Sequence, residues 1–217
     1  MGTALWLVPS AAQRALIESV LPTRSANTPL SANSYPKIIP HITLVSIPSD
    51  QVPTENPDTS TQNSVQKRLL HALSTPRPPP IRADFAALKT GDHYFRSVYI
   101  AVQRTPELVQ LNEHVIRELG VREGPAFPHM SLCYITDDDD TRHNERANIA
   151  RALYTSGTVI ADAEDDERCS LVCPGVDGVG SVSLTGFDGE EVWIVRCDGP
   201  VDTWQVLETT HLAPSPP

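Results

Sequence analysis

The sequence of 217 residues is poor in positive charge, with 17 Lys and Arg against 27 Asp and Glu and a formal net charge of −10. Affinity for a long nucleic acid depends on Lys and Arg side chains that neutralise phosphates. We therefore expect no long DNA or RNA partner. Long apolar runs are also missing, since no stretch approaches the roughly 20 apolar residues of a membrane-spanning helix. We accordingly expect no membrane partner.

Cysteine is scarce as well, with four residues in the chain. Cys133 and Cys197 lie in apolar, strand-like runs and are interpreted as buried thiols. Cys169 and Cys173 have no second cysteine pair and no nearby histidine, so the spacing does not favour a zinc site. The longest apolar run near the start, residues 4–8, is too short for the core of a signal peptide. These features indicate a soluble protein of the reducing cytoplasm, with no metal and no cofactor.

The apolar pattern predicts an α+β protein with antiparallel pairing, because helical and strand periodicities alternate along the chain. The expected helices cover residues 11–21, 65–73, 106–119 and 142–154. The expected strands cover residues 4–8, 38–47, 81–88, 95–102, 127–135, 181–187, 191–197 and 201–207. We expect loops at 48–63 and 162–180, and a hairpin turn at Asp188-Gly189. The acidic run 137–140 is interpreted as the start of a helix rather than a metal-binding loop.

An internal repeat divides the chain into two similar halves. Each half has a strand, a helix, a loop and then a second strand that begins with Pro-His: residues 40–44 in the first half and 128–132 in the second. This pattern predicts one bilobal domain over residues 1–217, with intertwined, pseudo-symmetric lobes.

The repeated element pairs a histidine with a hydroxyl residue two positions later. These pairs are His41 with Thr43 and His129 with Ser131. Side chains at i and i+2 lie on the same face of a strand, so each imidazole is expected beside its own hydroxyl while the intervening residues point into a core. A polar face without partners is costly to bury, so we expect this face to line a cleft. A duplicated structural strand, in which each histidine and hydroxyl satisfy each other, is the alternative.

Two histidines and two hydroxyls suit the hydrolysis of a cyclic phosphodiester. One imidazole can remove a proton from water while the other protonates the departing ribose oxygen, because histidine titrates near neutral pH. The hydroxyls of Thr43 and Ser131 can hydrogen-bond the non-bridging phosphate oxygens, whose charge grows in the transition state. This chemistry needs neither a metal nor a carboxylate. The other five histidines lack this context and are interpreted as surface or packing residues.

The two His-x-Ser/Thr motifs resemble the signature of the 2H phosphoesterase superfamily. Further segments resemble the cyclic phosphodiesterases of fungi and plants: residues 4–9, 40–44, 94–98, 127–134 and 192–195, Gly199-Pro200 and Trp204. The resemblance implies two antiparallel sheets that line a central cleft, with helices outside and one catalytic histidine in each lobe. It also implies metal-independent hydrolysis of ADP-ribose 1″,2″-cyclic phosphate and of nucleoside 2′,3′-cyclic phosphates downstream of tRNA splicing.

The same resemblance implies roles for individual residues. His41 and His129 are expected to be catalytic, with His129 activating water and His41 acting as the acid, and Thr43 and Ser131 are expected to bind phosphate. Tyr134 and Trp6 match aromatic residues of the family's cleft. An aromatic ring such as Trp6 can stack on a base, although packing in the core is the alternative.

Phe95 and Arg96 are weaker candidates for substrate contacts. Tyr94 or Phe95 would form a second stacking wall, and Arg96 would bring positive charge. Strand alternation predicts that only one of Phe95 and Arg96 faces the cleft.

Two other functions stay open. The first is an RNA-end-processing 2H enzyme, either 2′–5′ ligase-like or an exonuclease, which the acidic composition disfavours because RNA binding needs a basic groove. The second is a non-catalytic nucleotide-binding module, which has no need for two proton-transfer groups. The preferred hypothesis is a monomeric enzyme that acts on a small cyclic-phosphate nucleotide.

Overall fold

The computed structural model describes residues 2–24, 29–48, 67, 70, 71, 73, 79–122, 124, 127–163, 165, 167–175 and 179–212. Apart from Pro48, which ends a strand, the predicted loop at 48–63 lies outside these residues, as does most of the predicted helix at 65–73. No helix in the described part of the chain is long and apolar enough to cross a membrane.

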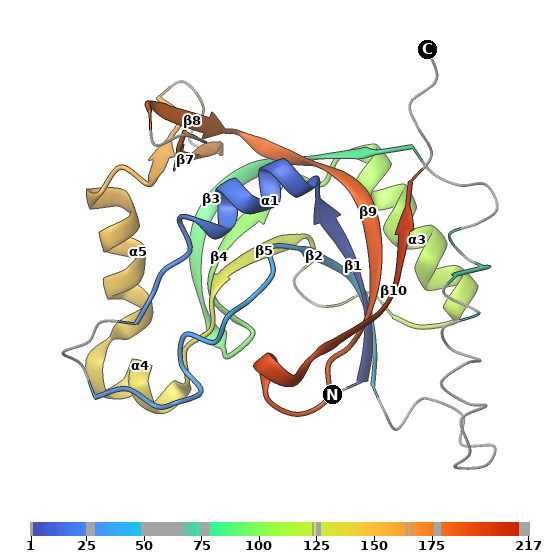
Figure 1. Ribbon diagram of the computed structural model, residues 1–217, viewed down its shortest axis with the longest axis horizontal. Helices are drawn as coiled ribbons and strands as arrows, with labels where there is room; N and C mark the ends of the chain where they lie inside the picture. The colour runs from blue at the N-terminus through green and yellow to red at the C-terminus, as the bar shows by residue number, and fades with distance from the viewer. Residues whose placement is uncertain are drawn as a thin grey trace.

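The architecture is α+β with antiparallel sheets, as the sequence predicts (Figure 1). The large sheet has seven strands: β1 (Gly2–Pro9), β2 (Ile42–Pro48), β3 (Ile81–His93), β4 (Arg96–Val102), β5 (His129–Cys133), β9 (Gly186–Arg196) and β10 (Gln205–His211). Their order is β1-β2-β5-β4-β3-β9-β10, and β9 also pairs with β1, so the sheet closes on itself.

The two expected sheets of the cleft are thus joined into one. The arc of β1, β2, β9 and β10 meets the arc of β3, β4 and β5 through the β2–β5 and β3–β9 pairings. A separate small sheet contains β6 (Val159–Ala161), β7 (Cys169–Pro174) and β8 (Ser181–Leu184). It contributes no residue to the cavity described below.

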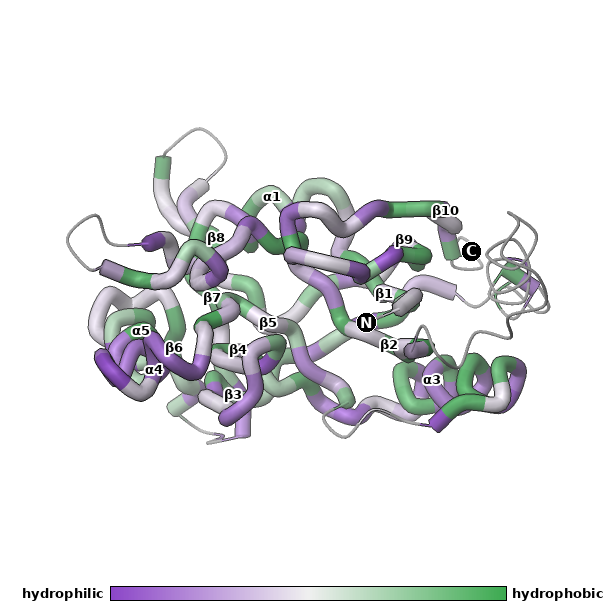
Figure 2. Tube along the Cα trace, turned by 90° about the horizontal axis from the view of Figure 1, so that it is seen from below, coloured by the Kyte–Doolittle hydropathy of each residue, from purple (hydrophilic) through white to green (hydrophobic). Residues whose placement is uncertain are grey.

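The helices begin and end where local chemistry predicts. They are α1 (Ala11–Glu18), α3 (Pro106–Leu119), α4 (Asp137–His143) and α5 (Glu145–Thr155), with a short 3₁₀ turn η2 at Val201–Thr203. The Thr105 side chain caps α3, Pro106 occupies the first helical position, and Gly120 ends the helix with φ 67°. Both views place α3 at one end of the molecule and the pair α4–α5 at the other (Figures 1 and 2).

The acidic run 137–140 forms the first turn of α4 behind the cap residue Thr136. The single helix predicted over 142–154 is two helices, because the chain turns at Asn144, whose φ is 52°. Asparagine tolerates this left-handed conformation better than most residues. Asp139 is buried in the first turn of α4 and accepts hydrogen bonds from the Ser31 N–H and the Ser34 hydroxyl.

The predicted hairpin at Asp188-Gly189 is wrong, because both residues lie inside the continuous strand β9. A Cβ atom at Gly189 would lie 2.6 Å from the Leu7 side chain, so the glycine allows close packing between β1 and β9 rather than a turn. Asp188 accepts from the Gln13 amide and from Arg82, which explains its polar character within a strand. The predicted loop at 162–180 also contains a strand, β7, which pairs with β6 and β8.

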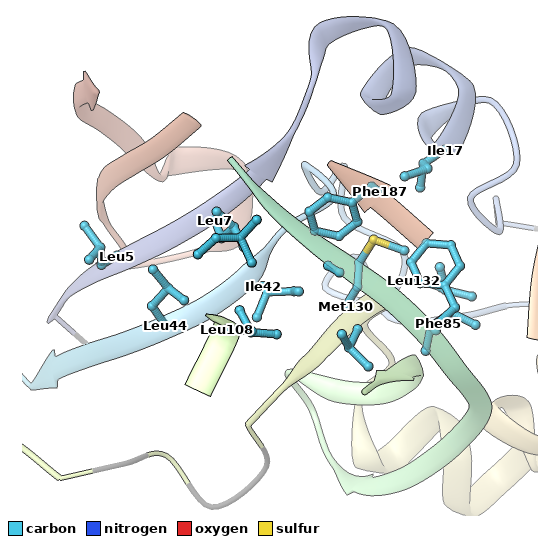
Figure 3. Close-up of a cluster of buried hydrophobic side chains, with 14 of the residues drawn as sticks. Leu5, Leu7, Ile17, Ile42, Leu44, Phe85, Leu108, Met130, Leu132 and Phe187 are labelled. Atoms are coloured by element: carbon cyan, nitrogen blue, oxygen red, sulfur yellow. The ribbon is translucent and has the colours of Figure 1, made fainter. Parts of the chain in front are cut away.

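The core lies between the sheet and its helices. It includes Ile42 of β2 and Met130 of β5, which are the apolar residues that follow the two histidines, and both are fully buried (Figure 3). Leu108 of α3 and Phe187 of β9 belong to the same cluster. The apolar side of each motif strand is therefore anchored, which fixes the direction of its polar side.

Candidate active site

The two motif strands lie next to each other. β2 and β5 are antiparallel, and Ile42 pairs with Met130. Extending this register by one residue places His41 opposite Ser131 and Thr43 opposite His129. Because alternate residues share a face, both histidines and both hydroxyls lie on the side away from the core.

This polar face lines a cavity of about 530 Å³. The cavity has a size typical of sites that take a small molecule. All eight residues selected from the sequence line it: Trp6, His41, Thr43, Phe95, Arg96, His129, Ser131 and Tyr134. The structure therefore brings together side chains from β1, β2, β4, β5 and the turn before β4.

His41 is held firmly and is shielded from water. Its side chain is 7% exposed, its ring stacks on Trp6 with centroids 3.7 Å apart, and its Nδ1 lies 2.6 Å from the Ile39 carbonyl oxygen. In a neutral imidazole that donates from Nδ1 to this carbonyl, Nε2 carries the free lone pair. Burial lowers the pKa of His41 to about 4, the Ile39 contact opposes the change, and nearby His129 adds to it.

His129 has a different environment at the start of β5. Its side chain is half-buried, and the Tyr99 ring contacts it edge-on with centroids 5.3 Å apart. His129 is also near enough to His41 to contribute to the lowering of the His41 pKa, after burial as the main cause.

The two hydroxyl residues also differ. Thr43 is half-buried and pairs with Trp6 across β1 and β2. Ser131 is 6% exposed, and its hydroxyl donates to the Phe95 carbonyl over 2.9 Å. The Ser131 side chain also interacts with the hydroxyl of Tyr134, whose pKa is raised by burial and lowered in part by this contact.

Phe95 and Arg96 both line the cavity, contrary to the prediction that only one of them could. Alternation does not apply, because β4 begins at Arg96 and Phe95 belongs to the preceding turn. The Arg96 Nη2 lies 3.6 Å from the Asp92 carboxylate, and the buried Nε has no hydrogen-bond partner within the described residues. Arg96 brings positive charge to the cavity, which Asp92 partly balances.

An aromatic group forms one side of the cavity. The Phe95 ring lies 5.5 Å from Tyr134 and 5.6 Å from Trp204, and Trp204 lies 5.9 Å from Trp6. One face of Trp6 is already covered by His41, so its role as a stacking surface concerns the rest of the ring.

Sequence reasoning did not select Trp204 and His93, which also line the cavity. Trp204 follows η2 in the turn between β9 and β10, where strand alternation gives no direction. The neighbouring Gly199-Pro200 turn was the available signal. His93 is exposed at the end of β3, and its Nδ1 accepts from the Phe95 N–H. The sequence predicts a surface or packing residue here, which agrees with the exposure of His93 but does not anticipate its place beside the cavity.

Comparisons with known proteins agree with this geometry. The family model described as "cyclic phosphodiesterase-like protein" matches residues 1–212. A 2′,3′-cyclic-nucleotide 3′-phosphodiesterase of Yarrowia lipolytica is 28% identical over 95% of this chain and 98% of its own length. A protein of the same name from Phaeosphaeria nodorum is 26% identical over 97% of this chain and 99% of its own.

A solved structure described as a phosphoesterase has a similar fold. It superposes with a TM-score of 0.50 at 12% identity and covers 98% of both chains. The family model, which matches almost the whole sequence, identifies the chain as a member of the cyclic phosphodiesterase-like family.

Proposed function

We propose that this protein hydrolyses nucleoside 2′,3′-cyclic phosphates to nucleoside 2′-phosphates. The observation that carries the proposal is the register of β2 and β5, which directs two histidines and two hydroxyls into one cavity. The names of the two fungal relatives support the same reaction class. By resemblance, the proposal extends to ADP-ribose 1″,2″-cyclic phosphate, with ADP-ribose 1″-phosphate as the product.

In the proposed reaction a water molecule attacks phosphorus as the bond to the ribose 3′ oxygen breaks. One imidazole takes a proton from the water, and the other gives a proton to the departing oxygen, so the ring opens without a net change in protons. Thr43 donates a hydrogen bond to a non-bridging oxygen, and Ser131 does so once its hydroxyl turns from the Phe95 carbonyl to the phosphate. Arg96 adds positive charge beside them. In this scheme no step requires a metal ion.

We assign His129 as the base and His41 as the acid, following the family resemblance. His41 is neutral in the empty cavity, because its pKa is about 4. An acid role therefore requires that the bound substrate raise this pKa. An anionic phosphate in contact with the ring does so, because a nearby negative charge favours the imidazolium.

Product analysis tests the proposal. The protein is incubated with adenosine 2′,3′-cyclic phosphate in the presence of a chelator, and 2′-AMP is separated from 3′-AMP. We expect 2′-AMP alone and undiminished turnover with the chelator. Loss of turnover on chelation would reveal a required metal. Formation of 3′-AMP would show that the bond to the ribose 2′ oxygen breaks instead of the bond to the 3′ oxygen.

An RNA that ends in a cyclic phosphate tests the RNA-end alternative. We expect a lower kcat/KM for this RNA than for the mononucleotide, because a chain with a net charge of −10 repels a polyphosphate. A preference for the RNA would favour an RNA-end-processing enzyme. Binding without turnover of any substrate would favour a nucleotide-binding module.

The setting is proposed from the same resemblance and from composition. We infer that the protein works as a monomer in the cytoplasm and acts downstream of tRNA splicing. We also propose that residues 1–217 form one bilobal domain, with β2 and β5 as the matching strands of its halves.

A further inference from the structure

A second cavity of about 530 Å³ adjoins the first. The two cavities share four residues: Trp6, His41, Tyr134 and Trp204. The reaction proposed above takes place in the first cavity and assigns no role to the second.

All three tryptophans of the chain line this second cavity: Trp6, Trp193 and Trp204. Trp193 belongs to β9 and pairs with Trp6 across β1 and β9. Trp193 is half-buried and does not line the first cavity. Flat indole rings along a concave surface suit a planar aromatic ligand, because base–aromatic stacking stabilises binding with little dependence on the base.

Two cations face the same space. Arg14 comes from α1, and its guanidinium carbon lies 4.9 Å from the centre of the Trp193 ring. Its Nη1 is buried and has no hydrogen-bond partner in the described part of the chain. The rest of the Arg14 side chain lines the cavity and provides positive charge there. Lys37 is exposed and lines the same cavity.

Carboxylates are present too, since Glu18 and Asp202 also line the cavity. Both are exposed, and among the described residues neither forms a salt bridge with Arg14 or Lys37. No carboxylate of the described residues therefore neutralises Arg14 or Lys37 by a salt bridge, and both side chains bring positive charge to the cavity.

We propose that the second cavity binds a nucleotide moiety, with its base against the tryptophan rings and its phosphate against Arg14 and Lys37. The moiety has two possible sources. It is either the ADP end of an ADP-ribose cyclic phosphate whose cyclic end lies between the histidines, or a separate nucleotide. The first source rests on the function proposed above, whereas the second is independent of it.

Kinetics with two substrates tests the first source. Arg14→Gln and Lys37→Gln are compared with Arg151→Gln, which removes an exposed arginine of α5 that lines neither cavity. If the ADP end occupies the cavity, Arg14→Gln lowers kcat/KM for ADP-ribose 1″,2″-cyclic phosphate by about tenfold, as expected for one charge-assisted hydrogen bond. The value for adenosine 2′,3′-cyclic phosphate then changes less than twofold.

Titration with 5′-AMP, followed by tryptophan fluorescence, tests the second source. A separate nucleotide predicts that Arg14→Gln weakens AMP binding by about tenfold while both kcat/KM values stay unchanged. Ser131→Ala, in the first cavity, then leaves AMP affinity as it is in the original chain. This control shows which cavity the AMP occupies.

The proposal is overturned if Arg14→Gln and Lys37→Gln alter neither kcat/KM nor AMP affinity relative to Arg151→Gln. If circular dichroism shows that Arg14→Gln does not fold, Lys37→Gln, at an exposed position, is compared with Arg151→Gln in its place. Failure of the original chain to hydrolyse either substrate contradicts the proposed function alone. The AMP titration then decides whether the second cavity binds a nucleotide.

Discussion

His41 and His129 stand at matching places in the two halves, yet their surroundings differ. His41 is stacked under Trp6 and buried, whereas His129 is half-buried and contacts Tyr99 only edge-on. The low dielectric around His41 disfavours its charged form. A duplicated motif therefore gives two imidazoles in different environments, of which the buried one has a lowered pKa.

The largest expected effect comes from removing either imidazole. We expect His41→Ala and His129→Ala each to lower kcat for adenosine 2′,3′-cyclic phosphate by roughly 10²–10⁴-fold, because each removes a proton-transfer group. Steady-state kinetics measures this loss. His211→Ala, at an exposed position outside both cavities, is the matched control. Wild-type turnover in either active-site variant would exclude the two-histidine mechanism.

Removing the hydroxyl of Thr43 and removing that of Ser131 should have unequal effects, because Ser131 is the more buried of the two. Thr43→Ala and Ser131→Ala each remove one donor to the phosphate, and we expect a loss of about 10²-fold in kcat. Ser131→Ala should also raise KM, because in the empty cavity the Ser131 hydroxyl donates to the Phe95 carbonyl and so positions the turn that carries the Phe95 ring before substrate binds. Equal KM values in the two variants would show that this hydrogen bond does not position the turn.

The burial of His41 should make the free energy of unfolding decrease at acid pH. The pKa of His41 is about 4 in the folded protein and near 6.5 in an unfolded chain. The unfolded chain therefore takes up the proton first, and stability falls as the pH drops from about 6.5 towards 4. This residue alone should cost about 3 kcal/mol at pH 4, since each tenfold change in proton affinity corresponds to about 1.4 kcal/mol.

Urea unfolding at pH 7.5 and pH 4 measures that cost. His41→Gln does not titrate, so it should lose about 3 kcal/mol less than the original chain between the two pH values. His211→Gln keeps His41 and should lose as much as the original chain. The same loss in His41→Gln would mean that other groups cause the acid sensitivity.

The sequence predicted the motif strands because their geometry is local. Alternation alone places His41 with Thr43 and His129 with Ser131, and the apolar residues between them must enter the core. The helix at 106–119 was predictable for a similar reason, since its cap, first-turn proline and terminal glycine are all written in neighbouring residues.

Features that depend on distant contacts were not predictable. Asp188-Gly189 has the sequence of a turn, but Leu7 of another strand and Gln13 of a helix explain it. Trp204 and Phe95 lie in turns, whose direction is set by tertiary packing rather than by alternation. The continuous sheet likewise depends on the pairing of β3 with β9, which are far apart in the sequence.

The smallest expected effect comes from reducing the ring of Trp6, which distinguishes its contribution to the burial of His41 from that of the surrounding strands. Trp6→Phe keeps an aromatic side chain but covers less of the His41 ring, so water should reach it more easily. Because burial is the main cause of the lowered pKa, we expect it to rise from about 4 towards 6.5, with less than a tenfold change in kcat. An NMR titration of the His41 ring measures the shift, and Tyr99→Phe, beside His129, is the matched control. If His41 titrates at the same pH in both variants, the strands around it rather than Trp6 exclude water from its ring. The difference in burial between the two histidines then comes from the sheet.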